Sequence, residues 1–377
     1  CWGFEHATFN AAFLDCVRHA YPSSSLEFFA EESHLEFVRE DLMRHGVASH
    51  VRLGGVSVPQ RDLGGVRRLP GDFRMVRRTL RSAESLGRAA VVFCSITPTG
   101  MLATWLLTRR CETRLRVIGV VHSALTGIER RSRRLHNRLV DMRTAVARHY
   151  PANITWLVLG EPILRNLRSL RPDLGPNWAY IDPVYHMPDT PPPAVPPTSN
   201  GGHVCFAMLG VANKSLQEFC DIATRVAAPP EKARFEVVGF LEASQDSKPT
   251  CPYLGPIADR PLRRCEFEER MAQVTYVISV PNPQKYRLAL SATLLDALAF
   301  TKPGIYLRND FVEHYHRELG DIGYLCPDLP AVVHTVKDLI AAWPSERYHN
   351  QVATILQGRE RFRPEVVAPQ LQSRLGL

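Results

Sequence analysis

Residues 280–303 read VPNPQKYRLALSATLLDALAFTKP and follow the apolar run VTYVIS of residues 274–279. The apolar run predicts a buried strand and the apolar content of 291–300 predicts a helix, so that strand, loop and helix follow in order. Hydroxyl and cationic side chains gather where this helix begins. Because a helix N-terminus presents unpaired N–H groups and a partial positive charge, we expect an anion site there, most simply for a phosphate. Its candidate side chains are Tyr286, Arg287, Ser291 and Thr293.

A plainer alternative assigns these residues to local structure alone. Ser291 or Thr293 would then be an ordinary helix cap, and Arg287 a solvated surface charge. The stretch by itself leaves both interpretations open.

The same alternation of apolar strands and helices runs through both halves of the chain, which at 377 residues is long for one domain. Continuously apolar strands between helices predict parallel sheets that are covered on both faces. The halves meet at residues 188–202, a proline-rich linker that ends in Ser-Asn-Gly-Gly. We therefore expect an α/β protein of two facing, doubly wound, Rossmann-like domains, 1–187 and 203–345, followed by C-terminal helices in 346–377 that pack back toward the first domain. Within the first domain, residues 132–149 predict one helix.

Composition is that of an ordinary globular protein, with 45% hydrophobic and 22% charged residues. Nine cysteines without a C-x-x-C pair predict thiols in a reducing compartment, not a disulfide framework or a zinc site. No stretch has the length and apolarity of a signal peptide or a membrane span. We expect a cytoplasmic protein, with peripheral attachment to the inner face of the membrane as an option. The sequence begins abruptly at Cys1, which leaves open whether a segment precedes it.

The net positive charge is confined to the first half of the chain. Residues 1–196 hold 26 arginines, no lysine and 18 acidic residues, whereas residues 197–377 are balanced. A basic half suggests an anionic partner such as a membrane surface or a lipid pyrophosphate, but an all-arginine half also results from a GC-rich genome. Aromatic residues are not interleaved with the arginines, which argues against a nucleic-acid partner.

Two arginine runs carry much of this charge. On helices their spacing spreads charge around half a turn or more, as a solvated face does. Placed beside a cleft, they could instead hold a lipid pyrophosphate at an anionic membrane. The runs are Arg67, Arg68, Arg74, Arg77, Arg78 and Arg81, and Arg130, Arg131, Arg133, Arg134 and Arg138.

Residues 294–303, LLDALAFTKP, resemble the donor-site helix of GT-B-fold glycosyltransferases. That helix has an acidic residue, Ala, a hydrophobe, Ala, two small residues, a variable residue and Pro. In the family the acidic residue binds the ribose of a nucleotide-sugar, and Asp296 occupies its place. One departure is Leu288, which stands where the family usually has a second Glu.

Two further stretches resemble the same donor domain. FAMLGVANKS at 206–215 is similar to the strand, glycine turn and basic residue that open it, which implies that Gly210 and Lys214 approach a diphosphate. FEVVG at 235–239 is similar to the next strand and ends at Gly239. A second departure is Val211, where the family usually has another cation.

Three residues of the first domain are candidates for the chemistry. His122 ends an apolar strand, so it should lie at the carboxyl edge of the sheet, and it resembles the histidine that follows the equivalent strand in many GT-B enzymes. Glu5 and His6 lie in the first loop, where the acceptor-binding loop of this fold would be, and offer an acid–base pair. A histidine at a strand end is also often held by a loop for structural reasons alone.

The resemblance implies a glycosyltransferase that moves a sugar from a nucleoside diphosphate sugar to a polysaccharide or lipid-linked saccharide. It implies no cofactor and no metal, an acceptor on the first domain, a donor on the second, and a C-terminal helix that crosses back to the first domain. One alternative is a non-catalytic scaffold or regulator on a degenerate GT-B fold, for which Leu288 and Val211 are the evidence. Another is a nucleotide-sugar epimerase, which would not need a basic acceptor face.

Overall fold

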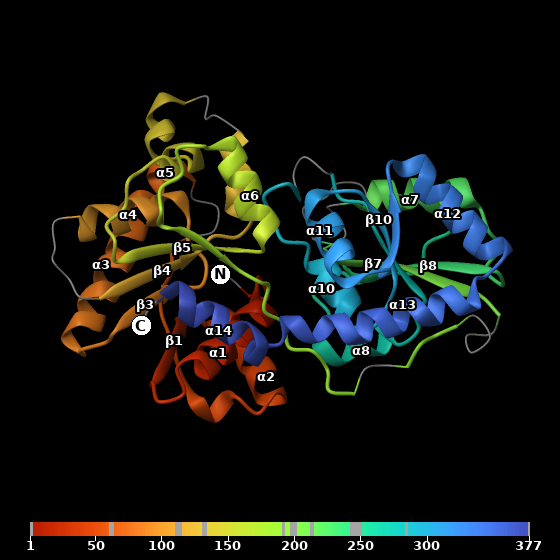
Figure 1. The fold of residues 1–377 in the computed structure, drawn as a ribbon, viewed down its shortest axis with the longest axis horizontal. Coiled ribbons are helices and arrows are strands. Elements are labelled where there is room, and N and C mark those ends of the chain that lie inside the picture. The colour runs from red at the N-terminus through yellow and green to blue at the C-terminus, as the bar shows by residue number, and fades with distance from the viewer. Residues whose placement is uncertain are drawn as a thin grey trace. The chain divides into compact units, whose positions relative to one another are not determined.

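The computed structural model describes residues 3–59, 64–109, 115–129, 134–190, 193–196, 202–211, 215–241, 251–282 and 286–375. They form two compact units (Figure 1). Unit 1 contains the chain up to His186, the short segment Leu288–Leu290, and the chain from Phe362 on. Unit 2 contains Met187–Arg287 and Ser291–Arg361.

Unit 1 has a four-stranded parallel sheet in the order β3-β4-β5-β6 and a separate parallel pair, β1-β2. Arg88 links the two, because its guanidinium donates to Ser25 Oγ at 3.0 Å and pairs with Glu27 at 2.9 Å. The elements of this unit are α1 (Ala7–Ala20), β1 (Leu26–Ala30), α2 (Glu32–Arg44), β2 (Val51–Gly55), α3 (Leu69–Ser85), β3 (Ala90–Phe93), α4 (Pro98–Thr108), β4 (Arg116–Val120), α5 (Met142–Val146), β5 (Ile154–Leu159), α6 (Glu161–Leu170), β6 (Trp178–Ile181) and α14 (Pro364–Leu375).

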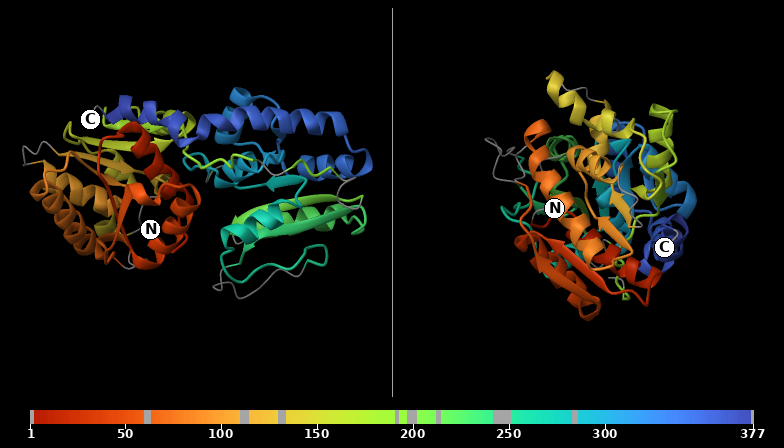
Figure 2. Two further views of the ribbon diagram at one scale, coloured as in Figure 1. Left: turned by 90° about the horizontal axis from the view of Figure 1, so that it is seen from below. Right: turned by 90° about the vertical axis from the view of Figure 1, so that its left-hand side faces the viewer.

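The C-terminal helix α14 packs against α1 and the sheet of unit 1, and Figure 2 shows the two helices side by side. Pro364 stands at its first position, where a proline costs the helix no hydrogen bond. Val367, Leu371 and Leu375 follow at four-residue spacing and are buried. They meet Phe13 of α1 in one apolar cluster. The expected crossover helix is confirmed.

Unit 2 has a five-stranded parallel sheet in the order β11-β10-β9-β7-β8. Isolated bridges join Phe235 to Leu254 and Phe240 to Ala258 beyond β8. With this extra edge the order is that of a Rossmann fold, in agreement with the expected architecture. The elements of this unit are β7 (Val204–Val211), α7 (Leu216–Val226), β8 (Ala233–Phe240), α8 (Arg264–Met271), β9 (Tyr276–Ser279), α10 (Ala292–Ala299), β10 (Gly304–Leu307), α11 (Asp310–Leu319), β11 (Gly323–Cys326), α12 (Leu329–Ala341) and α13 (Ser345–Gly358).

The division into units differs from the expected domains at the C-terminus. Helix α13 belongs to unit 2, and the chain returns to unit 1 only at Phe362. Tyr348 of α13 explains this, because its ring is fully buried in the core of unit 2 against Tyr276 and Trp343. Its hydroxyl also accepts the backbone N–H of Val195 at 3.2 Å, so a part of the proline-rich linker packs on unit 2.

The single helix expected over 132–149 is wrong. The structure has a 3-10 segment, η4 (Leu135–Val140), and then the short helix α5. Asp141 separates them with an extended backbone, and its carboxylate accepts the N–H of Thr144 at 2.9 Å, which starts a new helix. The apolar periodicity continues across this break, which is why the pattern alone indicated one element.

Truncation of a buried α14 side chain tests the packing of the crossover helix. Leu371→Ala should lower the free energy of unfolding of unit 1 by about 2–5 kcal/mol, because it leaves a cavity in a fully buried cluster. Urea denaturation followed by fluorescence of Trp156 and Trp178, both in unit 1, measures the change. The matched control is Val366→Ala, on the exposed side of the same helix, which should change stability by no more than about 0.5 kcal/mol. Equal effects in the two variants would contradict the packing of α14.

Candidate functional site

The winding of unit 2 reverses at β7. β8 lies on one side of β7 and β9 on the other, and the connections therefore leave in opposite directions. In an open parallel sheet this reversal opens a crevice at the carboxyl ends of the two strands. Those ends are Gly210 and Val211 on β7 and Ser279 on β9. This edge of unit 2 is the candidate ligand site.

Two glycines lie at this edge of the sheet. Gly210 and Gly239 lie opposite each other on β7 and β8. A Cβ atom on Gly239 would lie 1.8 Å from the carbonyl oxygen of Gly210, so the close approach of the two strands requires glycine there. Gly210 has φ +86°, a left-handed conformation that other residues rarely adopt, and it turns the chain out of the sheet. Lys214, the cation expected next, lies outside the described residues.

Helix α10 begins beside this edge and contacts both β7 and β9. Ser291 is its N-cap, and its buried hydroxyl oxygen accepts the N–H of Leu294 at 3.3 Å. The plainer alternative therefore holds for the Ser291 side chain, which caps the N-terminus of α10. The backbone amides of the first helical residues, before Leu294, are then the groups that a ligand could bind. Thr293 is half-buried in the first turn, and Asp296 is half-buried one turn farther along.

The segment before α10 joins the two units. Tyr286 and Arg287 are half-buried, and burial raises the pKa of the Tyr286 hydroxyl. The chain then enters unit 1 at Leu288, whose side chain is buried, and Leu290 packs on the apolar cluster of α1 and α14. Leu288 thus has a packing role, which accounts for an apolar residue where the resembling family has a carboxylate.

In unit 1 the structure brings two of the expected residues together. His122 follows β4 and is buried, and its ring stacks on the ring of His6 with centroids 4.2 Å apart. The ring of Phe9 also packs on His122, in a T-shaped arrangement with centroids 4.8 Å apart. His6 is exposed, and it stands immediately before α1 in a left-handed backbone conformation with φ +57°. Glu5, next to it, is half-buried.

The protonation of His122 follows from its surroundings. Its Nε2 lies 2.8 Å from the carbonyl oxygen of Cys94, and because a carbonyl only accepts, Nε2 carries the hydrogen. Burial, followed by the charge of His6, lowers the pKa of His122 to about 3. The imidazole is therefore neutral at physiological pH, with the Nδ1 lone pair available as an acceptor. A group with this pKa is a weak base and suits hydrogen bonding better than storing a proton.

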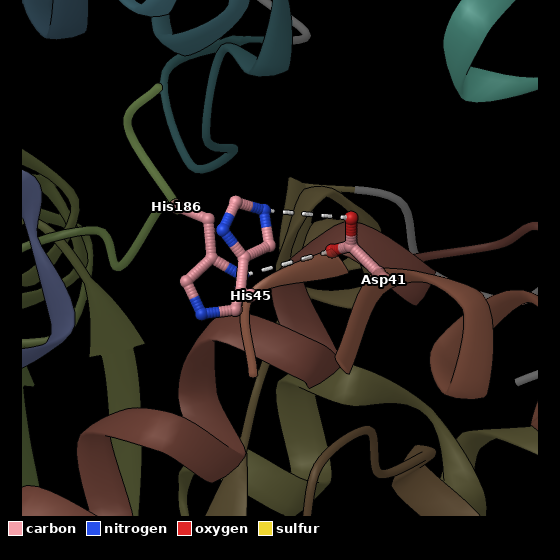
Figure 3. Close-up of side chains that lie close together, drawn as sticks. All are labelled: Asp41, His45 and His186. Carbon is pink, nitrogen blue, oxygen red and sulfur yellow. Dashed lines mark ion pairs between the residues drawn. The ribbon is translucent and has the colours of Figure 1, made fainter. Parts of the chain in front are cut away.

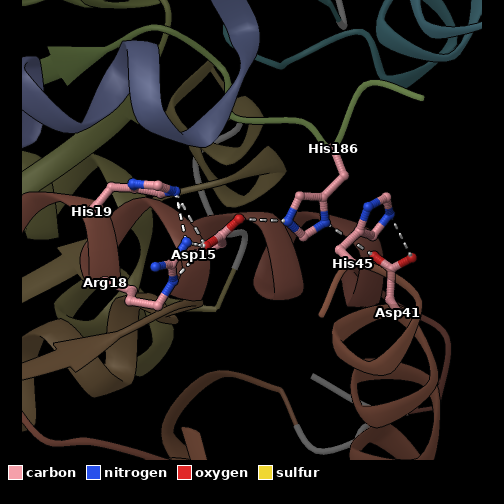
Figure 4. A network of polar contacts seen from close by, with 6 residues as sticks. All are labelled: Asp15, Arg18, His19, Asp41, His45 and His186. Atoms are coloured by element: carbon pink, nitrogen blue, oxygen red, sulfur yellow. Dashed lines mark hydrogen bonds and ion pairs between the residues drawn. The ribbon is translucent and has the colours of Figure 1, made fainter. Parts of the chain in front are cut away.

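A second polar cluster of unit 1 was missed by the sequence analysis (Figure 4). His186, buried just after β6, lies between two carboxylates on different helices. Its Nε2 is 3.2 Å from Asp15 of α1, and its Nδ1 is 3.8 Å from Asp41 of α2. Asp15 also accepts from Arg18 Nε at 2.9 Å. The ring of His45 stacks on His186 with centroids 4.0 Å apart.

The charges of this cluster outweigh the effect of its burial. Burial alone would lower the pKa of His186, but the hydrogen bond that it donates to Asp15 and the nearby Asp41 carboxylate raise this pKa. Burial would likewise raise the pKa of Asp15, yet His186 and Arg18 lower it. One sequence signal could have found the cluster, since Asp41 and His45 stand four apart and share a helix face. The partner of this pair, His186, is distant in sequence and only the fold supplies it.

No protein-family model matches this sequence, and no curated protein matches it. Solved structures nevertheless share its fold. HepE from Anabaena, solved in complex with UDP and glucose, is 11% identical with a TM-score of 0.66, covering 100% of this chain and 98% of that one. A glycosyltransferase from Rickettsia africae is 8% identical with a TM-score of 0.65, covering 99% and 96%. The chain has the GT-B fold.

The GT-B fold also serves other chemistry. A UDP-N-acetylglucosamine 2-epimerase is 12% identical to this chain with a TM-score of 0.54, covering 100% of this chain and 94% of that one. At these identities the likeness is one of fold, and activity has to be argued from the site.

The burial of His122 predicts a specific pH dependence of stability. Its pKa is about 3 in the folded protein and about 6.5 when unfolded, so between these values only the unfolded state binds the proton, and stability falls as the pH falls. In His122→Gln this contribution is absent. The free energy of unfolding of the wild type should therefore fall more steeply than that of the variant, by about 1.4 kcal/mol per pH unit between about pH 6 and pH 4. Urea denaturation across this range measures both slopes, and parallel slopes would mean that His122 is solvated or charged in the native state.

Proposed function

We propose that the protein is a glycosyltransferase that moves a sugar from a nucleoside diphosphate sugar to a polysaccharide or lipid-linked saccharide. The observation that carries the proposal is the edge of unit 2 where the winding reverses, with the turn at Gly210 and the start of α10 beside it. An α/β crevice of this kind is the general ligand site of doubly wound sheets. Complexes of HepE with UDP support a nucleotide as the ligand class.

The donor would be held by unit 2. The first amides of α10, those of Ala292 and Thr293, would hydrogen-bond the diphosphate, and the helix dipole would favour its negative charge. Asp296, one turn farther along, would accept from the ribose hydroxyls. Arg287 and Lys214 are the cations proposed to neutralise the leaving diphosphate, and we propose that no metal ion is needed for this step.

His122, with His6 and Glu5, would act on the acceptor or on the donor sugar. The neutral His122 imidazole can accept a hydrogen bond from a sugar hydroxyl at Nδ1 while Nε2 stays on the Cys94 carbonyl. This hydrogen bond would orient the acceptor hydroxyl for attack on the donor sugar. Holding two reactants in the right orientation by itself lowers the reaction barrier considerably.

Two alternatives have their own support. The fold is shared with an epimerase, which would convert a free nucleotide-sugar without any acceptor. Leu288, buried in unit 1, and Val211 lack the charges usual in the resembling family and favour a non-catalytic scaffold. Sugar release or transfer that requires an acceptor supports the transferase, and conversion of the free donor supports the epimerase.

A nucleotide-binding titration tests the donor site. One of UDP, GDP or ADP should bind the full chain with saturation and raise its melting temperature by mass action. Asp296→Asn should weaken this binding about 10- to 100-fold, because a hydrogen bond to a charged group contributes about 1.5–3 kcal/mol. Isothermal calorimetry gives the affinities. The matched control is Asp338→Asn, on the exposed part of α12, which should bind as the wild type does.

Either of two results would contradict the donor site. If no nucleotide binds, the scaffold becomes the leading proposal. If a nucleotide binds but Asp296→Asn leaves its affinity unchanged, Asp296 is removed from the site.

An anionic acceptor or membrane is proposed for the arginine-rich part of unit 1. Arg74, Arg77, Arg78 and Arg81 of α3 are exposed and line one depression of about 370 Å³. Their spacing places them on one helix face, so the charge is more concentrated than we expected from the sequence. Arg68 is different, because it pairs with the buried Asp72 at 3.3 Å. Arg130, Arg131 and Arg133 lie outside the described residues.

Vesicle binding tests this proposal directly. None of the helices that the structure describes is long and apolar enough to cross a bilayer. The double variant Arg77→Gln and Arg78→Gln should bind anionic vesicles about 30-fold more weakly than the wild type, since each arginine near such a surface contributes about 1 kcal/mol. Co-sedimentation at low salt measures it. Arg225→Gln with Arg317→Gln removes the same charge from exposed positions of unit 2 and should have a much smaller effect; equal losses would indicate only net charge.

A further inference from the structure

The cluster around His186 has the composition of a metal site. Asp41, His45 and His186 each offer one ligand atom, and these atoms lie within 4.8 Å of one another (Figure 3). Asp41 lies in the last turn of α2, and His45 is the residue that ends this helix. His186 lies in the segment after β6. Two imidazoles and one carboxylate are a donor set that suits Zn²⁺ and related transition ions.

Two atoms of the cluster lack the partners that burial would demand. Asp41 Oδ2 and His186 Nδ1 are buried and make no hydrogen bond within the part of the chain that the structure describes. Asp41 is 8% exposed and His186 5%. A buried polar atom without a partner costs about 1–3 kcal/mol, so such a pair calls for an explanation. The two atoms are 3.8 Å apart, which is too far for a hydrogen bond between them.

The same separation fits two ligands of one ion. Ligand atoms at 2.0–2.1 Å from a tetrahedral Zn²⁺ are about 3.3 Å apart. His186 Nδ1 is 3.8 Å from Asp41 Oδ2, and His45 Nε2 is 4.0 Å from Asp41 Oδ1. All three ligand atoms lie within 4.8 Å of one another, so the side chains would have to move closer together to share one ion. The imidazole lone pairs lie in the ring planes and the two rings are stacked, so the His45 ring would also have to turn; its side chain is 24% exposed and has room to do so.

The far side of His186 is already arranged for a metal ligand. Asp15 Oδ2 lies 3.2 Å from Nε2, and a carboxylate only accepts, so Nε2 carries a hydrogen and Nδ1 is the atom directed at Asp41. A carboxylate behind a ligating histidine fixes its tautomer and raises its basicity, which is the usual second layer of such sites. Asp15 in turn is held by Arg18.

We propose that Asp41, His45 and His186 bind one divalent transition-metal ion, with Zn²⁺ favoured, and that Asp15 positions His186 for it. Because three protein ligands leave one tetrahedral position, the partly exposed side at His45 would hold water. The ion would have a structural role in unit 1, fastening α2 to the segment that ends at His186, and through Asp15 to α1. It is separate from the proposed sugar transfer, whose chemistry does not involve these residues.

The test is calorimetric titration of the full chain with Zn²⁺, after removal of metal by a chelator. It is done in a Cys265→Ser background, because the exposed thiol there is a competing ligand. We expect one saturable site that also binds Co²⁺ but not Mg²⁺. Asp41→Asn and His45→Gln should each weaken it more than about 100-fold, and Asp15→Asn about 10-fold, as loss of an outer-layer partner does.

His19→Gln is the matched control. His19 belongs to the same network, 3.6 Å from Asp15, but it does not face Asp41, so its loss should leave Zn²⁺ affinity unchanged. Circular dichroism of each variant in chelator checks that unit 1 is folded, and His45→Gln, at the exposed margin, is the variant least able to disturb it. Absence of a saturable site, or equal affinities for the wild type, Asp41→Asn and His45→Gln, would overturn the proposal and leave a protonated His186 between two carboxylates. Nucleotide binding is also measured with and without chelator. Because the metal site is separate from the proposed donor site, this measurement distinguishes failure of the metal proposal from failure of the transferase proposal.

Discussion

The reversal of winding at β7 is the constraint on which the candidate site depends. Parallel strands need long crossover connections, and a sheet buried on both faces needs those crossovers on both sides. At one strand the direction must change, and in unit 2 that strand is β7, between β8 and β9. The turn at Gly210 and the start of α10 both lie at the edge that this reversal opens. Because Gly239 has no Cβ, β7 and β8 can approach each other closely at Gly210; a Cβ there would lie 1.8 Å from the Gly210 carbonyl oxygen.

Helix α1 has a comparable role in unit 1. It packs on α2, on α14 and on the central sheet, so it is common to two apolar clusters. Its first residues place His6 on His122, and its third turn places Asp15 on His186. From His6 to Asp15 the helix rises about 13 Å, which separates the two polar sites along its length. A ligand that fixes α1 at the His122 site would therefore also order the helix that carries Asp15, and an ion bound at the His186 cluster would order the helix that follows His6.

The fold was predictable from the sequence because apolar strands and amphipathic helices have different periods. The parallel sheets rest on such patterns, whereas the GT-B resemblance rests on the motifs at 206–215, 235–239 and 294–303, and the crossover of the terminal helix is what that resemblance implies. The prediction of one helix over 132–149 was wrong because the hydrogen bond between the Asp141 carboxylate and Thr144, which begins a new helix, leaves the apolar period unchanged. The assignment of α13 failed for a similar reason, since only three-dimensional packing puts Tyr348 in the core of unit 2.

The sequence alone determined which residue types were available and in which elements they lie. That was enough to predict Gly210, Ser291 and Asp296 near one edge of a sheet, because the ends of parallel strands and the starts of the following helices share that edge. Only the tertiary structure decided what surrounds each group. It made Ser291 a cap and His122 a neutral imidazole, because burial and partners set hydrogen bonding and pKa. It also joined Asp15, Asp41 and His186, which are up to 171 residues apart, since a folded chain brings together side chains that no spacing relates.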